Sequence, residues 1–567
     1  MPTRPTTQPR RLAIAAVLLV LTLLIAACSS DGPSSHTDSA AFGAGSASPT
    51  VSSGPVHPNI VFVLTDDLSM DLLRYMPQVR ALQRRGLTLD NYFVSDSLCC
   101  PSRSSIFTGD FPHDTGVFTN AGRGGGIGAF FAHGDERKTF NVALQRAGYR
   151  TAMMGKYLNG YLQGPRRSPV SSRYVPEGWS QWDVAGFAYS EYDYTLNEDG
   201  RLRYFGHAPG DYLTSVLARR GAQFIDSSAQ AGQPFFLELA TFSPHAPYTP
   251  APRDRHSFPG LTAPRPPSFD ALPFDAPRWL AGHPALRPKQ LRDINRVFRR
   301  RAQAVQSVDR LLATIEAAVR ANGQAGNTYI VLSSDNGLHT GEYRLMPGKL
   351  TAFDTDIHVP LVITGPGVLA GSSSGAMSEN VDLAKTFEAI GSTTAPSDGH
   401  SLTPLLRGGT PGGWRNAVLV EHHGPAFDRD DPDRQTGQSG NPTTYEAMRT
   451  PQFLYVEYRN GQRSFYDLRA DPYELHNIIW SLSATRLAQL HSELAGLQNC
   501  HSGAACWSAS HVSLGGQAAL HQWRAAVQEE LRLVPNPRLG GQVSQRFGAH
   551  IGRALRRAAA GLAHAAP

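Results

Sequence analysis

Hydrophobic residues form short, continuous runs along most of this chain, and these runs alternate with stretches of helical periodicity. The runs are rich in β-branched residues and end in polar or glycine-containing segments, which is typical of strands buried on both faces of a parallel sheet. They predict strands at 59–64, 86–94, 149–154, 234–240, 328–332 and 359–363. Helical patterns lie before Arg85 and at 140–147 and 299–320. Strands that alternate with helices predict an α/β fold with a mainly parallel sheet flanked by helices.

The pattern changes near residue 410. Residues 247–288 are rich in proline and lack periodicity, which indicates a long surface loop within a catalytic domain spanning 58–410. Beyond it, polar loops surround strand-like pieces, from which we predict a smaller C-terminal α+β subdomain over 411–535; the pieces are 418–421, 453–458 and 463–468. Residues 536–567 form a basic tail, predicted to be disordered or helical, that either touches an anionic surface or has no function.

The N-terminus resembles an export signal. Arg10 and Arg11 precede an apolar run from Leu12 to Ala27, which is shorter than the roughly 20 residues of a bilayer span. Small residues before Cys28 resemble the bacterial lipobox, which implies cleavage after residue 27 and a lipid on Cys28. Residues 28–57 are rich in Ser, Gly, Ala and Pro and predict a flexible tether. We therefore expect an extracytoplasmic, membrane-anchored bacterial lipoprotein, with ordinary secretion as the alternative.

Charge and cysteine content narrow the class further. The chain has 53 Lys and Arg against 47 Asp and Glu, and three of the surplus arginines lie in the export segment. Basic and acidic residues in the rest of the chain are nearly equal in number, which argues against the concentrated basic face of a nucleic-acid-binding protein. Only five cysteines are present, which excludes a small fold held by disulfides. Cys500 and Cys506 are close in sequence and predicted to be extracytoplasmic, so we expect a disulfide between them.

Two pairs of polar residues follow predicted strands. Asp66-Asp67 comes directly after the first strand, and Asp335-Asn336 follows the strand at 328–332. Sheets of this class carry their chemistry at the carboxyl ends of strands. Carboxylate and amide oxygens suit Ca²⁺ or Mg²⁺ and not Zn²⁺ or copper. Each pair alone is also a common turn sequence, but together they predict a metal site.

A third candidate is the segment at 97–109, Ser-Leu-Cys-Cys-Pro-Ser-Arg-Ser-Ser-Ile-Phe-Thr-Gly. Pro101 and Ser102 predict the start of a helix, with Cys99 just before its N-terminus, where the helix dipole favours an anion. A disulfide between Cys99 and Cys100, a buried structural cysteine or a simple reactive thiol would fit the same position.

The pattern Cys-x-Pro-Ser-Arg followed by Thr-Gly resembles the signature of the type I sulfatases of the alkaline phosphatase superfamily. The resemblance implies an alkaline-phosphatase-like fold. It also implies that a formylglycine-generating enzyme oxidises Cys99 to formylglycine (3-oxoalanine). One hydroxyl of the hydrated aldehyde would attack sulfur, and the other would later expel sulfate by regenerating the aldehyde. Arg103 would hold this diol, and Cys100 would stay unmodified and buried.

The resemblance also assigns a metal set. Asp66, Asp67, Asp335 and Asn336 fall at the family's ligand positions, completed by the converted side chain of Cys99. The ion there is usually Ca²⁺, with Mg²⁺ as the alternative. By the resemblance, this ion polarises the sulfate and lowers the pKa of the diol.

Four further residues are implied to bind sulfate. Lys156 matches the lysine of a Gly-Lys-Trp-His segment, although Leu158 here replaces the histidine that many members have. His245 lies in a Pro-His-x-Pro segment and is implied to be a sulfate ligand and an acid for the leaving group. Lys349 matches a lysine that binds sulfate or protonates the leaving oxygen. His339 is close to the metal pair in sequence and is a candidate for lining the pocket.

Longer matches point to a branch of the family. Segments 155–161, 307–310, 327–341 and 466–478 are similar to N-acetylglucosamine-6-sulfatases and related heparan endosulfatases. The resemblance implies a sulfated carbohydrate as substrate, or an aryl sulfate. Substrate choice resides in loops such as 247–288 and 422–442, which diverge freely.

Two other functions remain open on the sequence. A hydrolase of the same superfamily could act on phosphate or phosphonate monoesters, since a cationic pocket also tolerates phosphate. A surface lipoprotein with an unconverted Cys99 could bind polyanions without catalysis.

Overall fold

The computed structural model describes residues 57–164, 168–425, 431 and 433–515. All of them belong to the second of two units, which begins at Pro55. The predicted export segment 1–27, Cys28 and the basic tail 536–567 lie outside the described residues, as does all of the tether except His57. Among the described helices, none is both long and apolar enough to cross a membrane.

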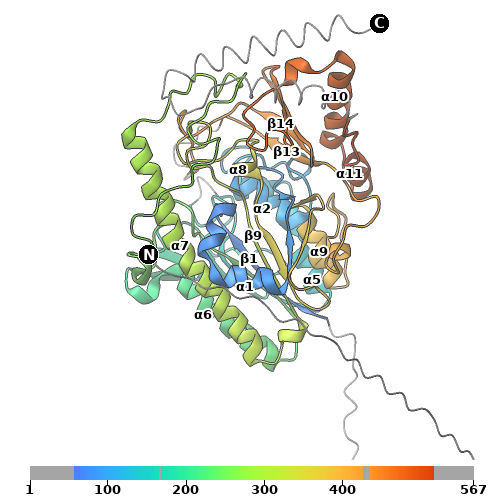
Figure 1. Cartoon of the computed structure of the whole chain (residues 1–567). Helices are drawn as coiled ribbons and strands as arrows, with labels where there is room; N and C mark the ends of the chain where they lie inside the picture. Colours follow the sequence, from blue (N-terminus) through green and yellow to red (C-terminus); the bar gives the residue numbers. More distant parts are fainter. Residues whose placement is uncertain (1–56, 165–167, 426–430, 432, 516–567) are drawn as a thin grey trace, which may run out of the picture. The chain divides into compact units, whose positions relative to one another are not determined.

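A ten-stranded sheet forms the centre of the part of the chain that precedes residue 410 (Figure 1). Its strands follow the order β11 (Ser372–Ser374), β2 (Leu87–Leu89), β10 (Leu361–Thr364), β9 (Thr328–Ser334), β1 (Asn59–Thr65), β8 (Phe235–Ala240), β4 (Arg150–Lys156), β5 (Gln181–Ala185), β6 (Tyr194–Glu198) and β7 (Arg201–Phe205). The five strands from β9 to β5 are parallel to one another, whereas β10, β6 and β7 pair antiparallel with their neighbours. The predicted α/β fold is therefore confirmed, with a parallel centre and mixed margins.

Helices cover both faces of this sheet because the central strands are apolar on both. On β1, Ile60 and Phe62 pack into one hydrophobic cluster while Val61 and Val63 pack into the other. One face carries α1 (Pro77–Arg85), α6 (Leu213–Gln230) and α7 (Pro288–Ala321). The other face carries α2 (Cys99–Thr108), α4 (Gly126–Ala132), α5 (Phe140–Arg146) and α9 (Asp382–Ile390). Short helices α3 (Pro112–Thr115) and α8 (Asp354–Ile357) lie in connecting segments.

The C-terminal part has its own antiparallel sheet (Figure 1). It consists of β13 (Val418–His422), β14 (Tyr445–Arg449), β15 (Phe453–Tyr458) and β16 (Arg463–Asp467), followed by α10 (Ala484–Gln498) and α11 (Gly503–Ala509). A disulfide joins Cys500, which lies between α10 and α11, to Cys506 within α11, as predicted. Leu490 and Leu494 of α10 pack with residues of this sheet into a separate core cluster.

Two predicted elements differ from the structure. The single strand predicted at 86–94 is wrong: β2 and β3 (Tyr92–Phe93) are separated by a turn at Asp90 and Asn91, residues that favour turns. β3 then pairs with β12 (Ser378–Glu379) outside the main sheet. The helix predicted to begin at Arg299 begins eleven residues earlier, at Pro288. Proline is tolerated in the first turn of a helix, because the backbone amide that it lacks would have no partner within the helix there.

Candidate active site

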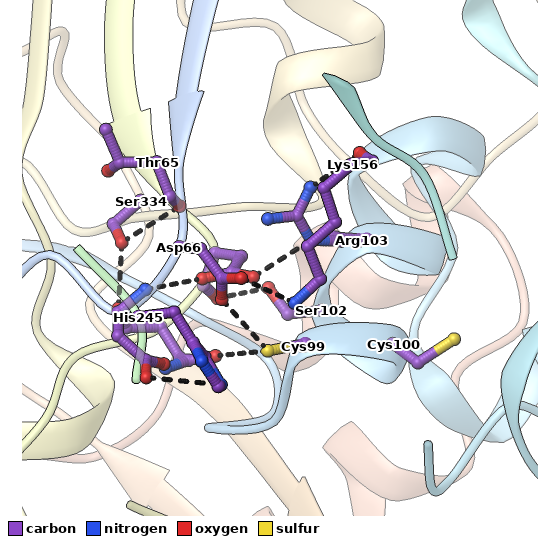
Figure 2. A network of polar contacts seen from close by, with 12 residues as sticks. Thr65, Asp66, Cys99, Cys100, Ser102, Arg103, Lys156, His245 and Ser334 are labelled. Atoms are coloured by element: carbon purple, nitrogen blue, oxygen red, sulfur yellow. Dashed lines mark hydrogen bonds and ion pairs between the residues drawn. The ribbon is translucent and has the colours of Figure 1, made fainter. Parts of the chain in front are cut away.

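The carboxyl ends of the central strands bring the candidate residues together. β1 leads into Asp66 and Asp67, and β9 leads into Asp335 and Asn336. β4 ends at Lys156, and His245 follows β8 by five residues. Because these strands are parallel neighbours, their ends meet at one edge of the sheet. Figure 2 shows Asp66, Lys156 and His245 around the sulfur of Cys99.

Three carboxylates form the centre of the site. Oxygens of Asp66, Asp67 and Asp335 lie within 4.8 Å of one another and of the Cys99 sulfur, and all four residues are buried. Asn336 Nδ2 donates to Asp67 Oδ1 at 2.6 Å, which places the amide beside the same carboxylates. Like charges at this distance repel strongly unless a cation lies among them. The set of buried, hard oxygen donors therefore fits a divalent ion such as Ca²⁺ or Mg²⁺.

Basic side chains surround this acidic centre, one for each aspartate. Lys156 Nζ lies 2.6 Å from Asp66 Oδ2, Lys349 Nζ lies 2.7 Å from Asp67 Oδ1, and Arg103 Nε lies 2.9 Å from Asp335 Oδ2. All three basic residues are buried. Buried cations are retained only where they are paired, so this array of alternating charge is the expected form of an anion site built around a metal.

Cys99 is the first residue of α2, so the helix begins two residues before the predicted start at Pro101. Its Sγ lies 3.0 Å from Lys349 Nζ, 3.2 Å from Asp66 Oδ1 and 3.6 Å from Asn336 Oδ1. Burial, together with the neighbouring Asp335, Asp433 and Asp66 carboxylates, raises the pKa of the Cys99 thiol well above its usual value. An unmodified thiol at this position is therefore neutral and a weak nucleophile.

Cys100 faces the other way (Figure 2). Its side chain is buried in the apolar cluster that covers this face of the sheet, and both cysteines are free. The alternative of a disulfide between Cys99 and Cys100 therefore does not describe this structure. Ser102 Oγ donates to the backbone carbonyl of Asp335 at 2.5 Å and so fixes α2 against the end of β9.

Arg103 lies one turn along α2 from Cys99 and contacts the ends of two strands, β9 and β4, that β1 and β8 separate. Its Nε contacts Asp335, and its Nη1 donates to the Lys156 carbonyl at 3.0 Å. Its Nη2 has no hydrogen-bond partner within the described part of the chain. This leaves one buried donor available for an oxygen of the nucleophile or the substrate.

His245 and Lys349 share a partner that the sequence analysis did not identify. Asp433 Oδ1 lies 2.5 Å from His245 Nε2 and 2.7 Å from Lys349 Nζ. Its other oxygen accepts a hydrogen bond from Asn120 Nδ2 at 2.7 Å, and Asn120 Oδ1 accepts from the Cys100 amide. Asp433 therefore connects both cations to the turn that carries Cys99. It lies in the loop at 422–442, and no local motif distinguishes it.

Charges around His245 keep it protonated. Burial lowers the pKa of its imidazole, but the carboxylates of Asp433, Asp66 and Asp67 outweigh burial and raise that pKa to about 9. Coulombic attraction of Asp433 and Asp67 likewise overcomes burial at Lys349 and raises the pKa of its ammonium group well above the usual value. At neutral pH the site thus holds a protonated imidazole that can act as a general acid beside a fixed ammonium group.

His339 and Leu158 are both buried, and their side chains pack against residues other than the three aspartates. The His339 ring contacts Asp356 through Nδ1 at 2.9 Å and the Ser439 carbonyl through Nε2 at 3.1 Å. Its backbone pairs with that of Gly348, which places His339 beside the segment that carries Lys349. Leu158 is buried in the apolar cluster and offers no proton at the position where many sulfatases have a histidine.

Comparisons with known proteins agree with this geometry. A model of the sulfatase family matches residues 58–390, and a model of the C-terminal region of N-sulphoglucosamine sulphohydrolase matches residues 341–500. The N-acetylglucosamine-6-sulfatase of Capra hircus is 34% identical over 483 residues, covering 80% of this chain and 85% of that protein. The enzyme of the same name from Homo sapiens is 34% identical over 486 residues, with coverage of 80% and 87%.

A solved structure, of a protein in complex with its substrate D-glucosamine-2-N,6-O-disulfate, has the same fold. Its TM-score is 0.62 at 23% identity, and the match covers 78% of this chain and 97% of that one. The two family models, the curated relatives and the shared fold all point the same way. We conclude that this chain belongs to the sulfatase family, as a type I sulfatase of the alkaline phosphatase superfamily, and that it is a sulfuric ester hydrolase.

Proposed function

We propose that this protein hydrolyses a sulfate ester of a sulfated sugar, using a formylglycine formed from Cys99. The observation that carries the proposal is the position of Cys99 Sγ, 3.0 Å from Lys349 and 3.2 Å from Asp66 in a buried ring of alternating charge. The similarity to N-acetylglucosamine-6-sulfatases supports a sulfated sugar as substrate. A dedicated formylglycine-generating enzyme would have to act on the chain first.

The chemistry would proceed in two steps on the converted residue. One hydroxyl of the hydrated aldehyde at position 99 loses its proton to solvent and forms a bond to sulfur, and the S–O bond to the sugar breaks. The departing sugar oxygen takes a proton from His245, which is protonated at neutral pH because of its carboxylate neighbours. The second hydroxyl then gives its proton to the neutral His245, the aldehyde forms again, and the C–O bond to the sulfate breaks so that sulfate departs. Addition of water restores the diol.

Positive side chains would bind the sulfate through these steps. Lys156, Lys349 and the free Nη2 of Arg103 are the donors nearest to Cys99, and they can stabilise the charge that develops on the sulfate oxygens. Asp66, Asp67, Asp335 and Asn336, together with the converted Cys99, would hold a Ca²⁺ ion. That ion would supply Lewis-acid polarisation of the ester and a lower pKa for the diol.

We also propose that the enzyme works outside the cytoplasm as a lipoprotein anchored through Cys28. The support is the N-terminal pattern of basic residues, a short apolar run and a cysteine after small residues. Mass spectrometry of the protein extracted from host membranes should find an N-terminus at Cys28 that carries a lipid, and a Cys28→Ala variant should carry no lipid. An unlipidated Cys28 in the mature protein would contradict the proposed anchor.

The substrate class can be tested with matched esters. We expect kcat/KM for N-acetylglucosamine 6-sulfate to exceed kcat/KM for N-acetylglucosamine 6-phosphate by about a hundredfold or more, because the dianionic phosphate brings an extra charge to a site already balanced by three aspartates. Steady-state release of sulfate and phosphate by one preparation measures both values. A preference for phosphate would instead establish the monoesterase function.

A further inference from the structure

The end of β5 adds an aromatic pair to the edge of the sheet where the reaction takes place. β5 is parallel to β4, with Ala185 opposite Lys156, so the chain that leaves β5 emerges beside that lysine. The next residues are Gly186-Phe187-Ala188-Tyr189. None of these four is among the residues that the sulfatase signature assigns to the site.

Tyr189 lies against the two cations on this side of the site. Its ring centroid is 5.1 Å from Lys156 Nζ and 4.6 Å from the centroid of the His245 ring. Only 6% of the Tyr189 side chain is exposed. Its ring therefore forms an inner wall directly beside the imidazole that faces the leaving group.

Phe187 packs on Tyr189 on the side that faces solvent. Its ring centroid is 5.1 Å from that of Tyr189, at an interplanar angle of 68°, yet the residue is 59% exposed. A ring that packs on Tyr189 and keeps more than half of its surface in solvent is available for contact with a ligand bound at this site.

Contacts on both sides fix the segment that carries the two rings. A Cβ at Gly186 would lie 2.4 Å from the Tyr161 carbonyl oxygen, so only glycine permits this close approach to the turn that follows Lys156. Farther along, the Glu191 carboxylate accepts hydrogen bonds of 2.8 Å from the Thr214 amide and from Ser243 Oγ. Ser243 precedes His245 by two residues, so the segment is tied to both cation-bearing loops.

We propose that Phe187 and Tyr189, here called the aromatic platform, bind the ring of the sugar whose sulfate is cleaved. The inference rests on the proposed function. The sulfur must lie near Cys99 and the leaving oxygen near His245, so the sugar ring extends past His245, along Tyr189 and toward Phe187. The C–H face of a sugar ring is apolar and flat enough to pack on an aromatic side chain, whereas its hydroxyls stay in water. Phe187 is thus a specificity-determining residue and not a catalytic one.

The test is a Phe187→Ala variant of the full chain with N-acetylglucosamine 6-sulfate as substrate. We expect KM to rise about tenfold, which corresponds to about 1.4 kcal/mol of lost binding. We expect kcat to change by less than about twofold, because packing of the sugar on Phe187 stabilises the bound substrate and the transition state equally. The inhibition constant of inorganic sulfate, which fills the anion site alone, should not change. Phe187→Tyr should keep the KM of the wild type.

Leu369→Ala is the matched control. Leu369 is 53% exposed and follows β10. The last residue of β10 pairs with Ile330, near the start of β9, whereas the active site lies at the end of β9. Leu369 is therefore on the side of the sheet away from the active site. This variant should leave both constants unchanged. An unchanged KM in Phe187→Ala, or an equal rise in KM and in the sulfate inhibition constant, would overturn the platform while leaving the sulfatase proposal intact. Failure of the wild-type enzyme to cleave the sugar sulfate would instead remove the proposed function.

Discussion

A Cys99→Ser variant is expected to lose multiple-turnover hydrolysis by at least about a thousandfold, the scale at which nucleophile removal acts in hydrolases. Serine is close to cysteine in size and can donate to the same Asp66 and Asn336 oxygens, so the site should keep its shape. A serine hydroxyl has no second hydroxyl on its carbon, however. Even if it attacked sulfur once, it could not expel sulfate by returning to an aldehyde. The measurement is steady-state sulfate release.

Cys100→Ser provides the matched control for this variant. Cys100 is the adjacent residue, is buried and free, and points away from the acidic centre. Its replacement places a hydroxyl in an apolar cluster, which should reduce stability but leave a turnover comparable to that of the wild type. Multiple turnovers by Cys99→Ser at a rate near that of Cys100→Ser would contradict the formylglycine mechanism.

Loss of one carboxylate from the acidic centre is the second change with a large expected effect. Replacing a residue that only hydrogen-bonds to a metal ligand commonly costs about 10–100-fold in metal affinity or activity. Asp335→Asn alters a proposed ligand itself, so it should lower kcat/KM by at least about a hundredfold. The variant also removes the charge that pairs with Arg103 at 2.9 Å. Both effects would act on the same step, because Arg103 and the proposed metal ligands all lie beside Cys99.

Metal content separates this prediction from general damage to the protein. Elemental analysis of the purified wild type should find about one Ca²⁺ per chain, and Asp335→Asn should contain much less. Asp309→Asn is a suitable control, because Asp309 is also buried but accepts hydrogen bonds from the Gln78 and Val79 amides at the start of α1. It should keep the metal and the activity. Full activity of chelated, metal-free wild-type protein would remove the aspartates from the role assigned to them.

Local sequence patterns were sufficient to locate the acidic centre. Asp66 and Asp335 each follow a buried apolar strand, and the parallel pairing of β1 with β9 makes the ends of those strands adjacent. The Cys99 segment was equally accessible, because its motif is contiguous and starts a helix. In both cases a few neighbouring residues determine the backbone that positions the side chain.

Residues that join the site through tertiary contacts could not be found in this way. Asp433 reaches His245 across 188 positions of sequence, from a loop whose composition carries no periodic signal. Phe187 follows β5, a strand that the hydrophobic pattern did not reveal because Asp183 interrupts it; that buried aspartate is paired with Arg220 of α6. Such pairings are made by the fold, and an isolated segment does not encode them.

The proposed mechanism requires that the catalytic group is an aldehyde made from Cys99. It is tested most directly by intact-peptide mass spectrometry across Cys99 on an active preparation from the native host. We expect a peptide in which the thiol of Cys99 is replaced by the aldehyde or its hydrate, with Cys100 unchanged. A preparation that hydrolyses sulfate esters while Cys99 is entirely a thiol, or is joined to Cys100 in a disulfide, would contradict it.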